Sequence, residues 1–564
     1  MKSKITKIST ALLLAGVTAA TTSCNLFKKK IPEDTIVIHA ANLGYGLDWL
    51  KDLTDRYSAK TGVQFKIDEA MGQEGVSGII TEIQSKSGRS DILVGRSSYT
   101  YHTTIYKGRI EAANGQKYDC AFEDLTDVYN SVYEGENAEK NTIAKKINSN
   151  FLDYYTVNGK QYGLPWANGF MSFARNVDVW NNLGMTNDDV PYTTNQMFKC
   201  FDKIFDKVSD HSKISPLIYS RTDEYYTSIP NVWFGQYEGK EAINNYIQGK
   251  GPSGQLDGNL FTYDGQVKAL EVLETIADNE VGNALRPEQY QYGEHKWTHA
   301  SSASAQFTQM QNYFLAGGSV FCLNGTWLEI EMSKKISDVK GKNIDFIKIP
   351  VISALADDKM AIGTEGEETY IADKTARDNK LGEIVKFVDA HPTVGDNESK
   401  PAGVSDEDVE IVREARLYNS VQGTDYDHMI VIPSWSNNKT VAKDFLKYMY
   451  SDEGLQAVYD KMEGHHLPAQ KSTGSYETNF TLTPFRKSAN AILDEGHFDG
   501  FSYLAEKCKM FSIAQVHTNF SNGISSGNPF TSMRDENKSA EEIINANDAN
   551  IKSRWDSIKG QIGE

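Results

Sequence analysis

The chain has 564 residues and a formal net charge of −18 at pH 7. A chain of this length is expected to fold around more than one hydrophobic core. Its acidity argues against a nucleic-acid partner, because phosphate binding requires clustered lysine and arginine. The sequence also contains 29 Tyr, 24 Phe and 8 Trp, whose rings can pack cores or stack on the apolar C–H faces of sugars.

The N-terminus has the residue order of a secretory signal. Lys2, Lys4 and Lys7 precede an apolar stretch over 8–20, and small residues follow at 21–23. The apolar stretch suits a signal peptide and is too short to span a bilayer. The sequence therefore predicts export.

Cys24 comes directly after the small residues, in a setting that resembles a bacterial lipobox. Thr21 stands where such a motif usually has Leu, Val or Ile. We expect removal of 1–23 as a signal peptide, acylation of Cys24, and a lipidated tether over 24–34. Lipid chains on this cysteine would hold the protein at the extracytoplasmic face of the cell membrane without a transmembrane helix. Ordinary secretion with a chance cysteine is the alternative.

Strand and helix patterns alternate in the first part of the mature chain. A helix with Trp49, Leu50 and Leu53 on one face ends at Gly62, and a second ends at Gly88. The strands that flank these helices are predicted at 35–38, 63–67 and 92–94. This order predicts a parallel sheet, in which ligands bind beyond the carboxyl ends of the strands. The loops 42–46 and 95–99 leave those ends and should face one cleft.

The rest of the chain continues as a mixture of helices and strands. Helices are predicted at 196–208, 265–279, 303–314, 381–389, 406–417, 441–449 and 455–462. Strands are predicted at 320–323, 344–349 and 429–433. The stretch 357–427 is polar and rich in acidic residues, and the tail 476–564 is mainly helical in pattern.

Several segments, in order, resemble the family 1 extracellular solute-binding proteins of bacterial ABC importers, the maltose-binding-protein-like group. The clearest are YGLPWANGFMSFARN at 162–176 and GGSVFCLNGTW at 317–327. The first strand with its loop and helix (36–62), the strand at 90–94, and the segment 428–469 also resemble this family. Together they cover most of 35–472.

The resemblance implies an α/β, two-lobed periplasmic-binding-protein fold whose lobes are joined by a multi-strand hinge. The expected crossings lie near 164–171, 345–352 and 452–458. The N-terminal lobe would comprise 35–165 and 351–453, with an acidic insertion at about 357–427. The C-terminal lobe would comprise 166–350 and 454–564. Such a hinge closes around its ligand.

Candidate ligand-binding residues lie on the loops and crossings that would border the cleft. Amides, hydroxyls and carboxylates there can hydrogen-bond sugar hydroxyls, and tryptophans can stack on sugar rings. The candidates are Asn42, Tyr45, Ser97, Tyr99, Trp166, Asn168, Asp223, Tyr225, Trp327, Glu365 and Asp427. Loop geometry, packing between the lobes or simple surface exposure are the alternative roles of these residues.

Catalytic and metal-binding signatures are not evident in the sequence. His465 and His466 lack a third ligand at a suitable spacing, so we expect no metal site and no cofactor. The expected function is that of a monomeric lipoprotein that delivers a mono- or oligosaccharide to ABC permease subunits. The alternatives are an exported lyase or glycosidase, a receptor for a non-sugar solute, and a sensor or adhesin.

Overall fold

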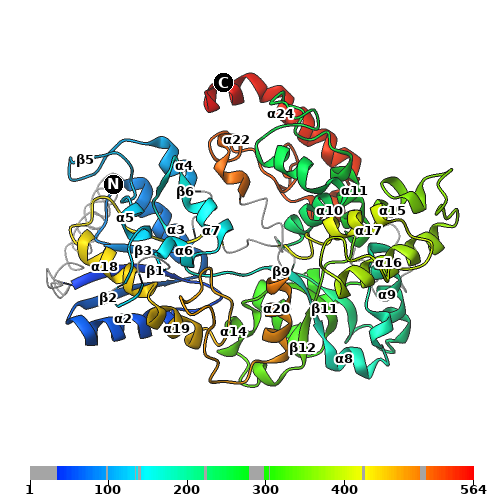
Figure 1. Cartoon of the computed structure of the whole chain (residues 1–564), viewed down its shortest axis with the longest axis horizontal. Coiled ribbons are helices and arrows are strands. Elements are labelled where there is room, and N and C mark those ends of the chain that lie inside the picture. The colour runs from blue at the N-terminus through cyan, green and yellow to red at the C-terminus, as the bar shows by residue number, and fades with distance from the viewer. Residues whose placement is uncertain are drawn as a thin grey trace, which may run out of the picture.

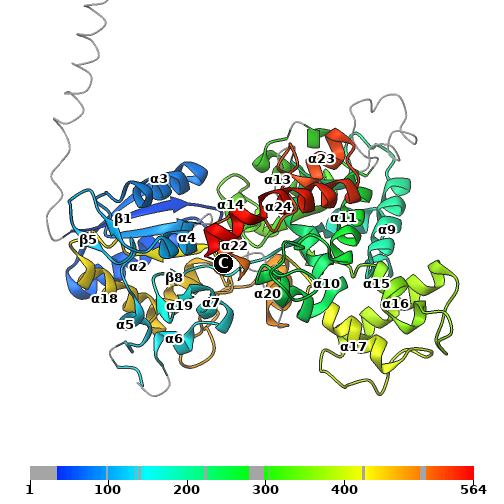
Figure 2. The same cartoon turned by 90° about the horizontal axis from the view of Figure 1, so that it is seen from above.

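The computed structural model describes residues 35–96, 100–133, 135–137, 141–220, 225–277, 297–303, 305–421, 426–495 and 504–563. They form two α/β lobes side by side, each built on its own sheet (Figures 1 and 2). The predicted signal peptide, tether and Cys24 lie outside the described residues. Within the described ranges, no helix is both long enough and apolar enough to cross a membrane.

The first lobe has a five-stranded sheet in the order β2-β1-β3-β13-β8. Its strands are β1 (Thr35–Asn42), β2 (Gln64–Met71), β3 (Ile92–Arg96), β8 (Leu164–Pro165) and β13 (His428–Val431). β1 pairs in parallel with both β2 and β3, which confirms the predicted parallel arrangement. β13 is antiparallel to β3 and β8.

Helices cover both faces of the first sheet. They are α2 (Asp48–Thr61), α3 (Gly72–Ser85), α4 (Thr100–Lys107), α5 (Thr126–Tyr129), α6 (Ile143–Lys146), α7 (Ser149–Tyr155), α18 (Lys439–Met449) and α19 (Asp452–Lys461). The predicted apolar face of α2 is buried, and Gly62 ends the helix with φ of 80°. α3 ends earlier than Gly88, because Lys86 takes the left-handed conformation with φ of 53°.

The second lobe has a four-stranded sheet in the order β10-β11-β9-β12. Its strands are β9 (Met171–Asn176), β10 (Ser215–Ile218), β11 (Ser319–Gly325) and β12 (Ile344–Ile347). Its main helices are α8 (Val177–Asn182), α9 (Thr194–Lys207), α10 (Tyr225–Ile247), α11 (Asp264–Ala277), α13 (Phe307–Leu315), α14 (Leu328–Ser333) and α20 (Pro484–Asp494). Side chains of β11 alternate between two cores, with Phe321 in one and Cys322 in the other.

The acidic insertion packs with the second lobe, which differs from the expectation that 351–453 belongs with the first. It contains α15 (Ala354–Asp358), the short helix η5 (Ala361–Gly363), α16 (Lys374–Ala390) and α17 (Asp406–Ala415). Their apolar side chains share a core with α9 and α10. The sequence pattern predicted helices at 381–389 and 406–417, which correspond to α16 and α17, but it did not predict α15 or η5 and did not show which lobe would cover them.

The crossings between the lobes follow from this packing. The first occurs as expected, between β8 and β9. The second lies after Val421, whose backbone pairs with that of Met171 through N–H···O bonds of 2.8 and 3.0 Å. The third lies between Ala469 and Phe485, because α19 and Ala469 pack in the first core. The expected crossings near 345–352 and 452–458 are therefore replaced by later ones.

The C-terminal segment from residue 504 returns to the boundary between the lobes (Figures 1 and 2). It contains η6 (Ala505–Lys507), α22 (Lys509–Ser512), α23 (Pro529–Glu536) and α24 (Ala540–Ile562). Met510 and Phe511 belong to the core of the second lobe. On the other side, α22 contacts α4 of the first lobe.

Candidate functional site

Tyr45 lies where the two lobes meet, on the loop that follows β1. Its hydroxyl is hydrogen-bonded to Thr326 Oγ1 of the second lobe at 2.9 Å. Its ring makes edge contacts with Trp166 and His428 of the first lobe, at centroid distances of 6.0 and 5.9 Å. It is only 4% exposed. The loop after β1 therefore faces the second lobe, as the sequence predicted, while the ligand-binding role of Tyr45 stays a prediction.

Trp327 contacts the cores of both lobes from the residue just before α14. Its side chain lies against Gly44 and Gly325, where an added Cβ would come within 2.9 and 2.2 Å of it. Both positions therefore require glycine for this close approach. Tyr45 and Tyr225 pack edge-on against Trp327 at 6.2 and 5.8 Å. Trp327 as a whole remains partly exposed.

We call Tyr45, Tyr225 and Trp327 the aromatic group. Trp166 is buried next to Tyr45 of this group, with 1% of its surface exposed. It stacks on Trp49 with a centroid distance of 5.0 Å and an interplanar angle of 21°. This is a packing arrangement rather than an open stacking surface. Asn168 is partly exposed on the same crossing segment.

A buried arginine and histidine, which sequence reasoning did not place here, complete the floor of the site. Arg486 Nη1 donates to His465 Nδ1 at 2.6 Å, and the His465 ring lies 4.5 Å from that of Tyr45. Burial and the adjacent guanidinium hold the pKa of His465 well below its usual value, so the ring is a neutral acceptor. The sequence analysis gave His465 no role in the site, because it weighed the adjacent His465 and His466 only as metal ligands and found no third ligand at a suitable spacing.

Asp427 is a buried carboxylate at the start of β13, with 2% of its surface exposed. Both of its oxygens accept from Arg96 Nε, at 3.1 and 3.2 Å. Burial alone would raise the pKa of Asp427, but Arg96 and His428 outweigh it and hold the pKa below its usual value. Asp427 is therefore an ionised partner of Arg96 behind the aromatic group.

Asn42 lies at the end of β1, and Glu365 lies in the acidic insertion. Asn42 donates through Nδ2 to Glu69, which also pairs with Lys51 at 2.9 Å. Glu365 is exposed and follows η5, which contacts α15 and α17 at the end of the second lobe far from the first (Figure 2). The structure does not bring Glu365 to the cleft. Ser97, Tyr99 and Asp223 lie outside the described residues.

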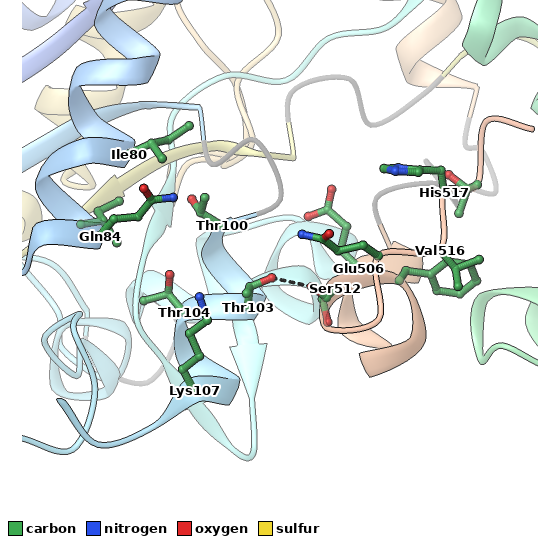
Figure 3. A pocket seen from close by; sticks show the side chains of 14 residues that line it. Ile80, Gln84, Thr100, Thr103, Thr104, Lys107, Glu506, Ser512, Val516 and His517 are labelled. Carbon is green, nitrogen blue, oxygen red and sulfur yellow. Dashed lines mark hydrogen bonds between the residues drawn. The ribbon is translucent and has the colours of Figure 1, made fainter. Parts of the chain in front are cut away.

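A cavity of about 430 Å³ lies beside this interface, between α3 and α4 of the first lobe and the C-terminal segment (Figure 3). Its lining combines hydroxyl, amide and apolar groups: Ile80, Ile83, Gln84, Thr100, Thr103, Thr104, Lys107, Glu506, Phe511, Ser512, Gln515, Val516, His517 and Thr518. This cavity could not be predicted from the sequence, because its two walls are far apart in the chain. Thr103 and Ser512, which bond across it, are separated by 409 positions.

Glu506 is the buried acid of this cavity, with 2% of its surface exposed. Tyr154 donates its hydroxyl to Glu506 Oε2 at 2.8 Å. His102 Nδ1 lies 3.8 Å from the same oxygen, while its Nε2 bonds the carbonyl of Tyr154 at 3.0 Å. Burial raises the pKa of Glu506 above its usual value, and the charge of Asp427 raises it further.

Comparisons with known proteins agree on the fold. No protein-family model and no curated protein matches the sequence. Among solved structures, the chain is similar to the GacH receptor of Streptomyces glaucescens, with a TM-score of 0.56 and 12% identity over 94% of this chain and 98% of that chain. It is also similar to an ABC transporter solute-binding protein from Thermotoga lettingae bound with α-D-tagatose, with a TM-score of 0.55 and 14% identity over 92% and 99% of the two chains.

A third similar structure is the solute-binding protein RafE in complex with raffinose, with a TM-score of 0.54 and 13% identity over 92% of this chain and 99% of that chain. The expected two-lobed α/β architecture is confirmed by these matches and by the two separate sheets. The chain therefore has the fold of the ABC-transporter solute-binding proteins.

Proposed function

We propose that this protein is an extracytoplasmic receptor that binds a carbohydrate between its lobes and delivers it to an ABC importer. The observation that carries the proposal is the aromatic group at the interface, where Tyr45, Trp327 and Tyr225 come together from both lobes. Structures with the same fold hold raffinose and α-D-tagatose. Aromatic faces and hydroxyl-bonding groups are the chemistry that sugar rings require.

Binding in this proposal needs no covalent step. Partly exposed Trp327 offers a ring for stacking, while buried Trp166 packs against Tyr45 and so supports the side chain that contacts Trp327. Tyr45 and Thr326 already join the lobes, so a ligand that adds contacts to both sides favours the closed arrangement. Selectivity then comes from hydrogen bonds to the sugar hydroxyls.

The cellular location of the protein and its partners belong to the same proposal. Cys24 carries the lipid anchor, and the protein works as a monomer at the extracytoplasmic face of the membrane. Its partners are the permease subunits of the importer, which recognise the closed, loaded form. The order of lysines, apolar residues and small residues before Cys24 supports this placement.

An exported glycosidase or lyase is the main competing function. Glycosidases use two carboxyl groups whose environments separate their pKa values. Asp427 and Glu506 do have opposite pKa shifts, but each is engaged by protein groups, Asp427 by Arg96 and Glu506 by Tyr154. These bonds favour a structural role for both carboxyls.

A thermal-shift screen with mono- and oligosaccharides tests the proposal. A carbohydrate that binds the folded state raises the unfolding midpoint in proportion to its concentration and affinity. Chromatography of the same mixtures should return the sugar unchanged, whereas an enzyme would yield products. A library with sugars, peptides and polyamines that produces a shift only with a non-sugar would overturn the carbohydrate assignment.

A further inference from the structure

We propose that the cavity between α3, α4 and the C-terminal segment is an additional carbohydrate subsite, which holds neutral sugar units of an oligosaccharide that extends from the aromatic group. This inference rests on the proposed function and specifies its substrate class. It implies that the ligand is an oligosaccharide rather than a monosaccharide.

The cavity adjoins the aromatic group through a short chain of contacts. Thr100, at the start of α4, lines the cavity and follows Arg96 closely in sequence. Arg96 pairs with Asp427, and the neighbouring His428 packs against Tyr45. Asp427 also acts electrostatically on Glu506 of the cavity, so the cavity and the aromatic residues lie on either side of the same Arg96–Asp427 pair.

The wall from the C-terminal segment is fixed in place by bonds to the first lobe. Thr103 donates its hydroxyl to the carbonyl of Ser512 at 2.8 Å (Figure 3). Lys507 Nζ donates to Asp153 Oδ1 at 2.6 Å. Phe511 belongs to the core of the second lobe. The cavity is thus built by both lobes and is a defined space rather than a gap beneath a loose tail.

The lining suits a neutral sugar. Thr100, Thr104 and Gln84 present hydroxyl and amide groups from the first lobe, and His517 faces them from the other side (Figure 3). Such groups can donate to and accept from sugar hydroxyls. Ile80, Ile83, Phe511 and Val516 supply apolar surface for the C–H faces.

The buried acid of the cavity also favours an uncharged occupant. The raised pKa of Glu506 moves its carboxyl toward the neutral form, which neither attracts a cation nor repels a hydroxyl. His102 Nε2 donates to the carbonyl of Tyr154, and its Nδ1 faces Glu506. The volume of about 430 Å³ lies within the range of small-molecule sites.

The test uses isothermal titration of the full mature chain with xylo-, malto- and chito-oligosaccharides, from the monosaccharide to the pentasaccharide. The wild-type protein should bind a longer member of one series at least about tenfold more tightly than the shortest member that binds. Thr104→Trp, which fills the cavity from α4, should abolish this gain and leave the affinity for the shortest ligand unchanged. Thr81→Trp on the exposed face of α3 is the matched control, because Thr81 does not line the cavity.

The outcomes separate this inference from the proposed function. Binding that is equally tight at all lengths, or a length effect that survives Thr104→Trp, overturns the subsite and leaves the receptor function intact. If no carbohydrate binds the wild-type protein, both proposals fall. If Thr104→Trp does not fold, the double variant Gln84→Ala/His517→Ala replaces it, because this variant removes polar lining groups without filling the cavity. It should reduce the gain in affinity with oligosaccharide length and keep the melting temperature of the wild-type protein.

Discussion

Trp327 and Trp166 should respond differently to truncation, because Trp327 is partly exposed and Trp166 is buried. We expect Trp327→Ala to weaken carbohydrate binding by about 2 kcal/mol, or about thirtyfold, by analogy with aromatic hot spots. Trp166→Ala should instead lower the free energy of unfolding by about 3–5 kcal/mol, since it leaves a cavity beside Trp49. Titration calorimetry and urea unfolding of both variants measure the two effects. An intact affinity in Trp327→Ala would remove this residue from the binding site.

Glu506 should make stability depend on pH in a direction opposite to that of an ordinary paired carboxylate. The pKa of Glu506 is raised in the folded state. At a pH between the usual carboxyl pKa and this raised pKa, Glu506 is protonated in the folded protein and ionised in the unfolded chain. The free energy of unfolding contributed by this group therefore falls as pH rises through that window. Glu506→Gln cannot ionise and can still accept from Tyr154, so its unfolding free energy relative to wild type should increase toward neutral pH.

Urea unfolding of wild type and Glu506→Gln at several pH values, from acidic to neutral, measures this difference. The comparison isolates Glu506 because Asp427, whose lowered pKa produces the opposite slope, is present in both proteins. Parallel stability profiles for the two proteins would show that Glu506 ionises normally in the folded state.

At the scale of elements, a largely shielded ion pair ties the end of α17 to α16 and to the strand region of the second lobe. Arg416 donates to both oxygens of Asp389, at 2.8 and 2.9 Å, and to the carbonyl of Ile349 at 2.8 Å. We expect Arg416→Met to lower the free energy of unfolding by about 2 kcal/mol, because the half-buried Asp389 carboxylate keeps its bond to Lys348 but loses its two-fold bond to Arg416.

Arg56→Met is the matched control for this change. Arg56 forms an exposed i,i+4 pair with Asp52 on α2, and such pairs contribute less than about 1 kcal/mol. Urea unfolding followed by tryptophan fluorescence measures both variants. Equal small effects would mean that the acidic insertion is not held to the second lobe by this ion pair.

At the scale of the whole molecule, the two-lobed architecture predicts closure on ligand. Among the described residues, the side chains that bridge the lobes at the aromatic group include Tyr45, which bonds Thr326, and Arg486, which lies between His465 and Thr326. A carbohydrate that contacts both lobes should therefore shift the population toward a more compact form. Small-angle scattering should give a smaller radius of gyration at saturation than without ligand, and identical curves would contradict a closing receptor.

The location of the protein in the cell is the second prediction at this scale. Cys24→Ala should move the protein from the membrane fraction to the soluble fraction or the medium, because the lipid chains are the expected anchor. Fractionation with metabolic labelling by a fatty acid measures this, with Cys120→Ala as a control for a cysteine that is buried in the first lobe. Wild-type protein that partitions to the membrane without a lipid label would contradict the anchor.

The sequence determined those parts of the structure that depend on local pattern. Period-two and period-3.6 apolar patterns placed β1, α2, β2, α3 and β3, and the carboxyl end of β1 correctly indicated that Tyr45 would face the other lobe. These features follow from neighbours in the chain, so a single sequence contains the information.

Only the tertiary structure decided which distant surfaces meet. Two helices of the acidic insertion, α16 and α17, could be predicted from the sequence, yet their burial against α9 and α10 depends on shape complementarity between segments far apart in the chain. The pairing of Arg486 with His465 and the cavity between α4 and the C-terminal segment arise in the same way. An apolar face or a buried charged side chain in the sequence indicates that it needs a packing or bonding partner. Which residue becomes that partner depends on long-range packing.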